Sequence, residues 1–295
     1  MPSSIPASAS SIARALARFC RRKPLGALGG LIVVTLVVMA VFAHWIAPHA
    51  YDETIRTARM KPPSLAFWMG TDNLGRDIFS RVVYGARVSV TVGFGAVVVA
   101  TVLAATVGIT SGYFGGAYDI VVQRVVDAWQ SFPALVIVLS VMAVLGPGTL
   151  NVILALGVIG AAGASRIIRG ATLGIVQNAY FEAARAIGCT HTRVILRYVL
   201  PNVAGTIIIL ATIGLGAAIL AESALSFLGF GVPPPYPSWG AMLSGSGRSF
   251  MYRAPWMAFW PGLAISLAVF GFNMLGDALR DVLDPRLRGA GGRVT

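Results

Sequence analysis

Charged residues are scarce in this chain of 295 residues. Asp, Glu, Lys and Arg make up 12% of it, against about 25% in a typical soluble domain. Hydrophobic residues make up 56%, and the mean hydropathy is +0.77. This composition excludes an ordinary soluble domain and predicts an integral membrane protein. The net charge of +12 is then interpreted as basic segments facing anionic lipid and the cytoplasm rather than nucleic acid.

Cysteine and lysine are also rare. The two cysteines, Cys20 and Cys189, are too few for a disulfide framework and are interpreted as unpaired thiols. Lys23 and Lys61 are the only lysines, and each is followed by proline. Neither can supply the Gly-Lys-Ser/Thr end of a phosphate-binding loop. We therefore expect no ATP hydrolysis by that route in this chain.

The sequence shows no pattern of a catalytic or metal site. His44, His49 and His191 lack the H-E-x-x-H spacing of a zinc site, and no G-x-S-x-G nucleophile turn occurs. We expect no enzyme activity, no cofactor and no metal.

Five long runs are free of charged residues. A helix that crosses a bilayer needs about 20 apolar residues, and the run from Ala128 to Ser165 is long enough for two, separated by Gly146-Pro147-Gly148. The predicted fold is therefore an all-α membrane protein with six transmembrane helices. The other runs are Pro24–Tyr51, Val88–Tyr118, Tyr198–Ala221 and Ala254–Gly276.

The first run also has features of a signal peptide. Arg21-Arg22-Lys23 precedes it, and Val41-Phe42-Ala43 resembles a cleavage site. The apolar stretch Leu25–Trp45 is longer than the usual 7–15 residues of a signal peptide. We therefore predict a retained first span.

Six spans place both ends of the chain on one side of the membrane. If that side is the cytoplasm, fifteen basic residues lie inside and eight outside, as the positive-inside rule requires. The predicted organisation is a cytoplasmic tail (1–24), a first transmembrane helix (25–47), an outer segment (48–87), a five-helix core (88–283) and a cytoplasmic tail (284–295). The core includes a charged cytoplasmic segment (176–197) and an outer loop (229–256) with a short helix at Trp239–Leu243.

The outer segment 48–87 contains a predicted amphipathic helix. Ile78, Val82 and Gly85 share one face and Arg81 lies off it. We expect this helix to lie along the outer membrane interface.

The charged segment contains FEAARAIGCTHTRVILRYVLPN, residues 181–202. A helix is predicted over Val176–Ile187, with Tyr180, Ala183/Ala184 and Ile187 on one face and Glu182 paired with Arg185. Gly188 suits a left-handed cap at its end. From these residues alone, the helix is equally a narrow surface for another protein or a plain connector on the membrane.

A few intramembrane residues have more than one interpretation. Glu222, near the outer end of the fifth span, either lines a cavity or makes a hydrogen bond between packed helices. Asp127 with Arg124 is expected to anchor the inner half of the third span, and Pro133 to kink it. Three glycines of the second span are expected to allow close helix approach: Gly93, Gly95 and Gly108.

Spacing over twenty positions gives a family resemblance. Glu182-Ala183-Ala184, Gly188 and Leu200-Pro201 match the EAA-x3-G-x9-I-x-L-P motif of bacterial ABC importer permeases, except that Tyr198 stands where the motif has Ile. Three further stretches resemble the second permease subunit of peptide/nickel-type importers: GTDNLGRDIFSRVVYGARVSV (70–90), ESALSFLGFGVPPPYPSWGAML (222–243) and LGDALRDVLDPRLRG (275–289). The resemblance covers residues from about 25 to 289.

The resemblance implies a type I ABC importer permease in a bacterial inner membrane. Its partners would be a second permease, two ATPases carrying all the ATP hydrolysis, and an extracytoplasmic binding protein. The segment 176–197 would hold a coupling helix that contacts an ATPase. The residues implied in coupling are Tyr180, Glu182, Ala183, Ala184, Arg185 and Gly188, and Glu222 is a possible pathway residue.

The cargo stays open at this point. Dipeptides, longer peptides, glutathione and nickel chelates are all carried by similar importers, and selectivity there rests largely on the binding protein. Two other classes remain as alternatives, an ion-driven secondary transporter and a structural membrane subunit. The first would need an internal repeat and broken helices around a midplane site, and no convincing repeat is present.

Overall fold

The computed structural model describes residues 19–21 and 23–283, so most of the two predicted tails lies outside it. Apart from an isolated bridge between Thr71 and Asp77, every regular element in the described part is helical. The long helices are α2 (Pro24–Val41), α4 (Ile78–Phe114), α5 (Gly116–Gln130), α6 (Ala134–Leu145), α7 (Thr149–Val176), α10 (Leu200–Phe227) and α13 (Trp256–Leu283). The short ones are α3 (Ala43–Ile46), η1 (Arg56–Ala58), α8 (Ala179–Ala186), α9 (His191–Val194), the π-turn η2 (Ile195–Val199), α11 (Trp239–Leu243) and α12 (Gly245–Ser249).

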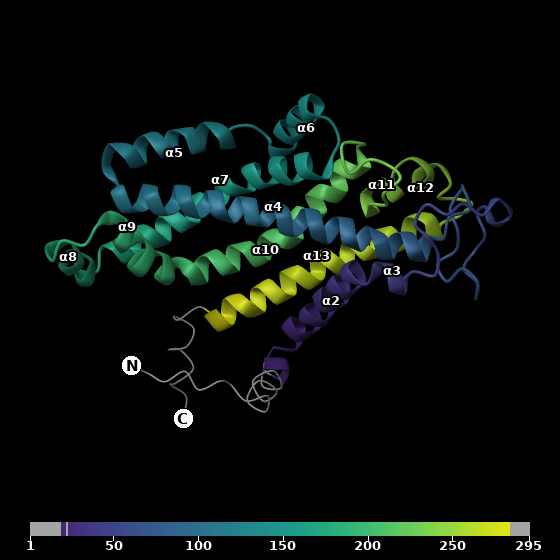
Figure 1. Ribbon diagram of the computed structural model, residues 1–295, viewed down its shortest axis with the longest axis horizontal. Helices are drawn as coiled ribbons and strands as arrows, with labels where there is room; N and C mark the ends of the chain where they lie inside the picture. The colour runs from purple at the N-terminus through teal and green to yellow at the C-terminus, as the bar shows by residue number, and fades with distance from the viewer. Residues whose placement is uncertain (1–18, 22, 284–295) are drawn as a thin grey trace.

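Apart from α6, the long helices run side by side, and most short ones gather at two ends (Figure 1). We call the end that carries α8 and α9 the inner end, and the end that carries α3, α11 and α12 the outer end. Helices α2 and α13 form one flank, and α5 lies on the opposite flank beyond α4 and α7 (Figure 1).

Five helices of the described residues are long and apolar enough to cross a membrane, and α9 to α10 counts as one of them. The consecutive pair α5 and α6 makes a sixth if it is counted as one bent span. The prediction of an all-helical, multi-pass membrane protein is therefore confirmed.

The bent span has its break where proline was expected to act. Pro133 is the residue before α6, and the axes of α5 and α6 differ by 83°. Proline favours this break because it has no N–H to donate and disfavours helix in the residue before it. The deviation is larger than the kink that the sequence predicted.

The predicted amphipathic helix at the outer interface is not a separate element. The structure has one helix, α4, of 37 residues, which begins at Ile78 and continues into the second span. Asp77 caps its start, with its side chain accepting a hydrogen bond from Ser80 N at 2.9 Å. Ile78, Val82 and Gly85 do share a buried face, but this face packs within the protein, where Gly85 meets Trp239. The local pattern indicated a buried face and could not show what covers it.

Glycines bring pairs of long helices into close contact. At Gly29 of α2, a Cβ atom would come within 2.7 Å of the Gly271 carbonyl oxygen on α13. At Gly108 of α4, it would come within 2.5 Å of the Ser165 carbonyl oxygen on α7. Gly93 and Gly95 similarly leave room for Ile219 and Ile153, so the expected close approach along the second span is confirmed.

The outer end is fixed by one buried and one half-buried tryptophan and by short turns. The predicted short helix is α11, with the predicted bounds Trp239–Leu243. Trp239 is fully buried, and the Trp256 indole donates to the Thr71 carbonyl oxygen at 3.2 Å. These contacts join segments that lie more than 150 residues apart in the chain.

Candidate functional site

Helix α8 lies at the extreme inner end, beyond the ends of α4, α7 and α10 (Figure 1). It follows α7 after only Gln177 and Asn178, where the Asn178 side chain donates to the Ile175 carbonyl oxygen at 2.8 Å. The sequence predicted a helix over Val176–Ile187. The structure assigns Val176 to the end of α7 and begins α8 at Ala179.

One face of α8 holds it to the rest of this chain. Phe181 and Ala184 are almost fully buried and belong to an apolar cluster with Val194 and Val199. Ala184 therefore packs against its own chain. The sequence pattern had placed it on the same face as Ala183, which is exposed. The anchoring role of Phe181 was missed, because its partners come from segments further along the chain.

The other face of α8 is open. Tyr180, Glu182, Ala183 and Ile187 are exposed, and Ile187 retains 78% of its accessible surface. The side chain of Arg185 lies outside the described part of the structure, so its predicted pairing with Glu182 stays a prediction. This face offers a small, mixed apolar and acidic surface at the inner end of the molecule.

The predicted cap of α8 is present. Gly188 has φ +78°, and Cys189 N donates to the Ala184 carbonyl oxygen at 3.1 Å. This six-to-one bond defines a Schellman ending, which needs a left-handed residue. The cap turns the chain sharply between α8 and α9.

A π-turn connects α9 to the long helix α10. It spans Ile195–Val199 and is followed by Leu200 and then Pro201, the first two residues of α10. Proline cannot donate a hydrogen bond, and its ring clashes with the carbonyl group four residues earlier, so the wider π-turn relieves both problems. Nearby, the Tyr113 hydroxyl lies 2.9 Å from His191 Nδ1, which joins the inner end of α4 to α9.

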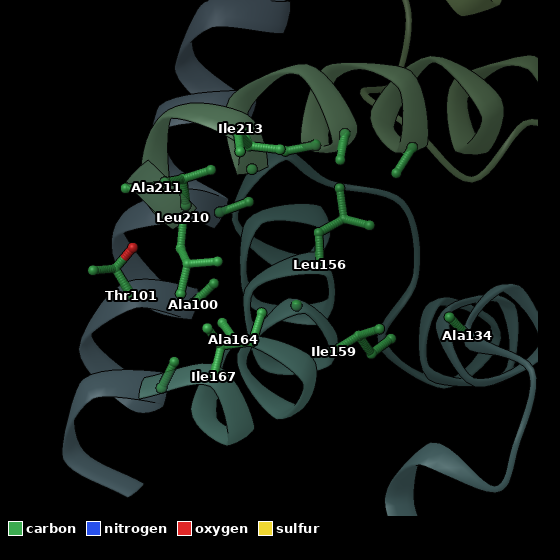
Figure 2. A pocket seen from close by; sticks show the side chains of 18 of the residues that line it. Ala100, Thr101, Ala134, Leu156, Ile159, Ala164, Ile167, Leu210, Ala211 and Ile213 are labelled. Carbon is green, nitrogen blue, oxygen red and sulfur yellow. The ribbon is translucent and has the colours of Figure 1, made fainter. Parts of the chain in front are cut away.

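A cavity of about 540 Å³ lies between α4, α6, α7 and α10. Figure 2 shows residues of all four helices around one space, among them Ala100, Ala134, Leu156 and Leu210. Apart from Thr101, the side chains that line it in the described part of the chain are apolar. The cavity can therefore accommodate apolar groups and offers very little hydrogen bonding.

Glu222 lies near the outer end of α10 and is fully buried. Its carboxylate accepts hydrogen bonds from Ser226 Oγ at 2.7 Å, Ser89 Oγ at 3.2 Å and Ser223 Oγ at 3.4 Å. The Ser89 bond connects α10 to α4. Glu222 is not among the residues that line the large cavity, and its part in a pathway stays a prediction.

Two ion pairs join α5 to α7. Asp119 accepts from Arg169 Nε at 2.6 Å and also from the Ser111 hydroxyl. Eight residues further along α5, Asp127 pairs with Arg166 and lies 3.8 Å from Arg124. The sequence had assigned Asp127 and Arg124 an anchoring role but missed both arginines of α7. These partners lie 39 and 50 residues away, so local spacing carries no signal for them.

No cluster of three or more His, Cys, Asp or Glu suited to a metal ion occurs among residues 19–21 and 23–283. His44 lies 3.5 Å from the Tyr84 hydroxyl, and His49 lies 3.4 Å from Glu53. The described part of the structure therefore combines apolar spans, a cavity between them and an exposed helix at the inner end, which is the architecture of a multi-pass membrane protein.

The comparisons with known proteins agree with this class. Residues 104–289 match the family of binding-protein-dependent transport system inner membrane components, and residues 10–63 match the N-terminal transmembrane domain of oligopeptide transport permease C. The chain belongs to this permease family. It is a permease subunit of a binding-protein-dependent ABC transporter, in which ATP hydrolysis lies on separate subunits.

Similar proteins include two kinds of bacterial permease. The dipeptide transport system permease protein DppC of Alkalihalophilus pseudofirmus is 40% identical over 268 residues, which are 91% of this chain and 88% of that protein. The glutathione transport system permease protein GsiD of Escherichia coli O157:H7 is 40% identical over 270 residues, 91% of this chain and 89% of that protein.

A solved structure supports the fold. An inward-facing form of the MetNI methionine ABC transporter has a chain that matches with a TM-score of 0.56, covering 69% of this chain and 96% of that one. At 18% identity this likeness concerns the fold alone, which is that of type I ABC importer permeases.

Proposed function

We propose that this chain is one of two permease subunits of an ATP-driven importer for dipeptides, oligopeptides or related solutes such as glutathione. The relatives named for dipeptide and glutathione transport support this cargo class, since each matches over 91% of this chain. The other partners are two ATPases on the inner side and a binding protein on the outer side. Nickel chelates remain the second cargo class, because the sequence motifs alone do not separate them from peptides.

The observation that carries the proposal is the exposed face of α8. It is anchored from behind by Phe181 and held at a fixed angle by the Gly188 cap. An ATPase that contacts Tyr180, Glu182, Ala183 and Ile187 would move α8 as a unit, and the connection through α9 and the π-turn would pass this movement to α10. The contact must be more favourable in one ATPase state than in the other, since equal affinity for both would shift nothing.

The proposed location is a bacterial inner membrane, with both termini in the cytoplasm. Lys23, just before the first span, pairs with Asp281 near the end of the last span at 2.5 Å, so these two points lie on the same side. Cys20 and Cys189 then both face the cytoplasm. A membrane-impermeant thiol reagent should label neither in intact cells and should reach the exposed Cys20 after lysis. Rapid labelling of either before lysis would overturn this topology.

Reconstitution in lipid vesicles tests the function. The two permeases, the ATPases and the binding protein should together accumulate a radiolabelled dipeptide or glutathione only when ATP is supplied. Removing this chain, or replacing ATP with a non-hydrolysable analogue, should abolish accumulation. Ion-driven uptake by this chain alone would support a secondary transporter instead. Uptake of a nickel chelate in place of both peptides would reassign the cargo and leave the ABC mechanism intact.

A further inference from the structure

The two ion pairs between α5 and α7 differ in their surroundings. In the Asp119–Arg169 pair, the side chains retain 11% and 31% of their surface, and Ser111 with Gln123 extends the hydrogen bonding. In the Asp127–Arg166 pair, they retain 42% and 44%. The first pair is closed by the protein, and the second is open on one side.

The open pair also carries an excess of positive charge. Arg124 lies 3.8 Å from the Asp127 carboxylate, and its side chain is 80% exposed. Two guanidinium groups thus share one carboxylate. The local charge of the group formed by Arg124, Asp127 and Arg166 is +1, whereas the Asp119–Arg169 pair is neutral.

This open charge group lies toward the inner end of helices that are long and apolar enough to cross a membrane, α7 alone and α5 together with α6. Arg166 follows Thr149, the first residue of α7, by 17 residues, or about 26 Å along the helix axis. The hydrocarbon layer is about 30 Å thick. A span that enters this layer at Thr149 therefore brings Arg166 to within about 4 Å of its inner edge, where an exposed charge faces water, lipid headgroups or a partner.

Away from Asp127, the face of α7 that carries Arg166 opens onto empty space. Gly163 and Gly170 lie one turn before and after it on the same face of α7, and a Cβ atom on either would meet nothing within 4 Å. The next residue, Ile167, lines the large apolar cavity (Figure 2). Ile159, two turns before Arg166 on the same face of α7, also lines the cavity, whereas Arg166 itself does not. Arg166 therefore lies just beyond the inner edge of the cavity, with open space on either side of it along α7.

We propose that Arg166 receives a carboxylate group of the transported solute as it leaves the apolar cavity toward the inner end. This inference rests on the proposed function and narrows its cargo to solutes with a free carboxylate, such as a peptide C-terminus. The planar guanidinium group can bind a carboxylate through two parallel hydrogen bonds. Asp127 holds Arg166 when no solute is present, and Arg124 compensates Asp127 when the solute takes its place. In this way each carboxylate and the Arg166 guanidinium keep a partner of opposite charge before and after the solute binds.

A double variant separates this role from a structural one. Arg166→Gln with Asp127→Asn removes both charges, so it avoids the unpaired charge that either single change would leave. The complex should assemble with its ATPases, but uptake of the dipeptide or glutathione should fall about tenfold or more, as expected for loss of a hydrogen bond between charged groups. The matched control is Arg169→Gln with Asp119→Asn, which should keep at least half of the wild-type uptake.

Two results of this comparison would overturn the proposal. If the Arg166 and Asp127 double variant kept uptake at the level of the control, the open pair would be an anchor between α5 and α7 and nothing more. If it failed to assemble while the control assembled, the pair would likewise be structural. If the wild-type importer accumulated neither the dipeptide nor glutathione, the proposed function itself would be wrong. That result needs no variant, so it is distinguishable from a failure of the Arg166 proposal.

Chemical replacement of the charge at position 166 separates the two roles, because uptake should depend on the sign of the added charge only if Arg166 binds the solute. Arg166→Cys in a chain with Cys20→Ser and Cys189→Ser can be treated with water-soluble thiol reagents that add a positive or a negative group. The positive adduct should restore uptake several-fold, and the negative adduct should not. Equal uptake with both adducts, or no reaction with either reagent, would contradict a water-accessible carboxylate site.

Discussion

The indole nitrogen of Trp239 donates a hydrogen bond to the main-chain oxygen of Val82 at 3.0 Å, across 157 positions of the chain. Trp239 is fully buried, and the lack of a side chain at Gly85 makes room for its ring, since a Cβ there would lie 2.7 Å from it. This contact fastens the outer loop to the start of α4.

Replacement of Trp239 should therefore destabilise the outer end. Trp239→Phe should cost about 1 kcal/mol through the lost hydrogen bond, and Trp239→Ala about 3–5 kcal/mol through the cavity it leaves. Thermal unfolding of the purified complex measures both. Trp68→Phe is the control, because Trp68 is 61% exposed and should tolerate the change. A wild-type melting temperature for Trp239→Ala would contradict this account.

Adjacent glycines of α2 should respond differently to the same methyl group. Gly29→Ala would place a Cβ 2.7 Å from the Gly271 carbonyl oxygen and should separate α2 from α13, at about 1–3 kcal/mol. Gly30→Ala meets only Leu275 at 3.7 Å and should be neutral or slightly stabilising. Resistance of the complex to unfolding in detergent compares the two. Equal effects would show that α2 does not pack on α13 as described.

Substitution of Gly188 tests whether α8 must be held at a fixed angle for coupling. Its Cβ would touch nothing within 4 Å, so any effect of substitution comes from the backbone at φ +78° alone. Gly188→Val should cost about 1 kcal/mol or more, because a β-branched residue is poorly tolerated there, whereas Asn visits this conformation readily. We expect Gly188→Val to insert in the membrane but to lower uptake per ATP hydrolysed, and Gly188→Asn to stay close to wild type. The check is uptake and ATPase rate measured together in vesicles. If Gly188→Val coupled uptake to ATP hydrolysis as well as the wild type, Gly188 would only connect α8 to α9 and would have no role in coupling.

Glu222 should tolerate an amide but not an apolar side chain. Gln keeps an acceptor for the surrounding serines and adds donors that their hydroxyl groups can accept. Glu222→Leu leaves buried hydroxyl groups without a partner, at about 1–3 kcal/mol for each group left unsatisfied. Co-purification with the ATPases should be retained in Glu222→Gln and reduced in Glu222→Leu. If an intact Glu222→Gln complex transports poorly, the pathway role gains support; if that complex falls apart, the group is structural.

The sequence predicted features that depend on neighbouring residues. The Gly188 cap and the bounds of α11 follow from local chemistry and are confirmed. The position of the bend at Pro133 is also confirmed, although the sequence predicted a kink and the structure has a break of 83°. Features that depend on distant contacts were missed or misassigned. Phe181 and Tyr180 look alike as aromatic neighbours in a helix, and only the packing of Val194 and Val199 decides that Phe181 is buried. In the same way, nothing near Asp127 in the sequence indicates that Arg166 becomes its partner.

The break between α5 and α6 leaves main-chain groups that need hydrogen-bond partners from outside this chain. Helix α5 is 15 residues long, so the break comes about 22 Å along it, which is too short to cross a hydrocarbon layer of about 30 Å before the chain turns. The last carbonyl groups of a helix have no helical donors, and residues 130–136 around the break are exposed on this chain. Lipid offers no hydrogen bonds to such groups, and each one left bare there costs several kcal/mol. A neighbouring subunit or a water-filled passage must therefore cover this flank. The subunit made without its partners would be a substrate for membrane quality control, so the amounts of the two permeases in a cell should be matched by degradation of whichever is in excess.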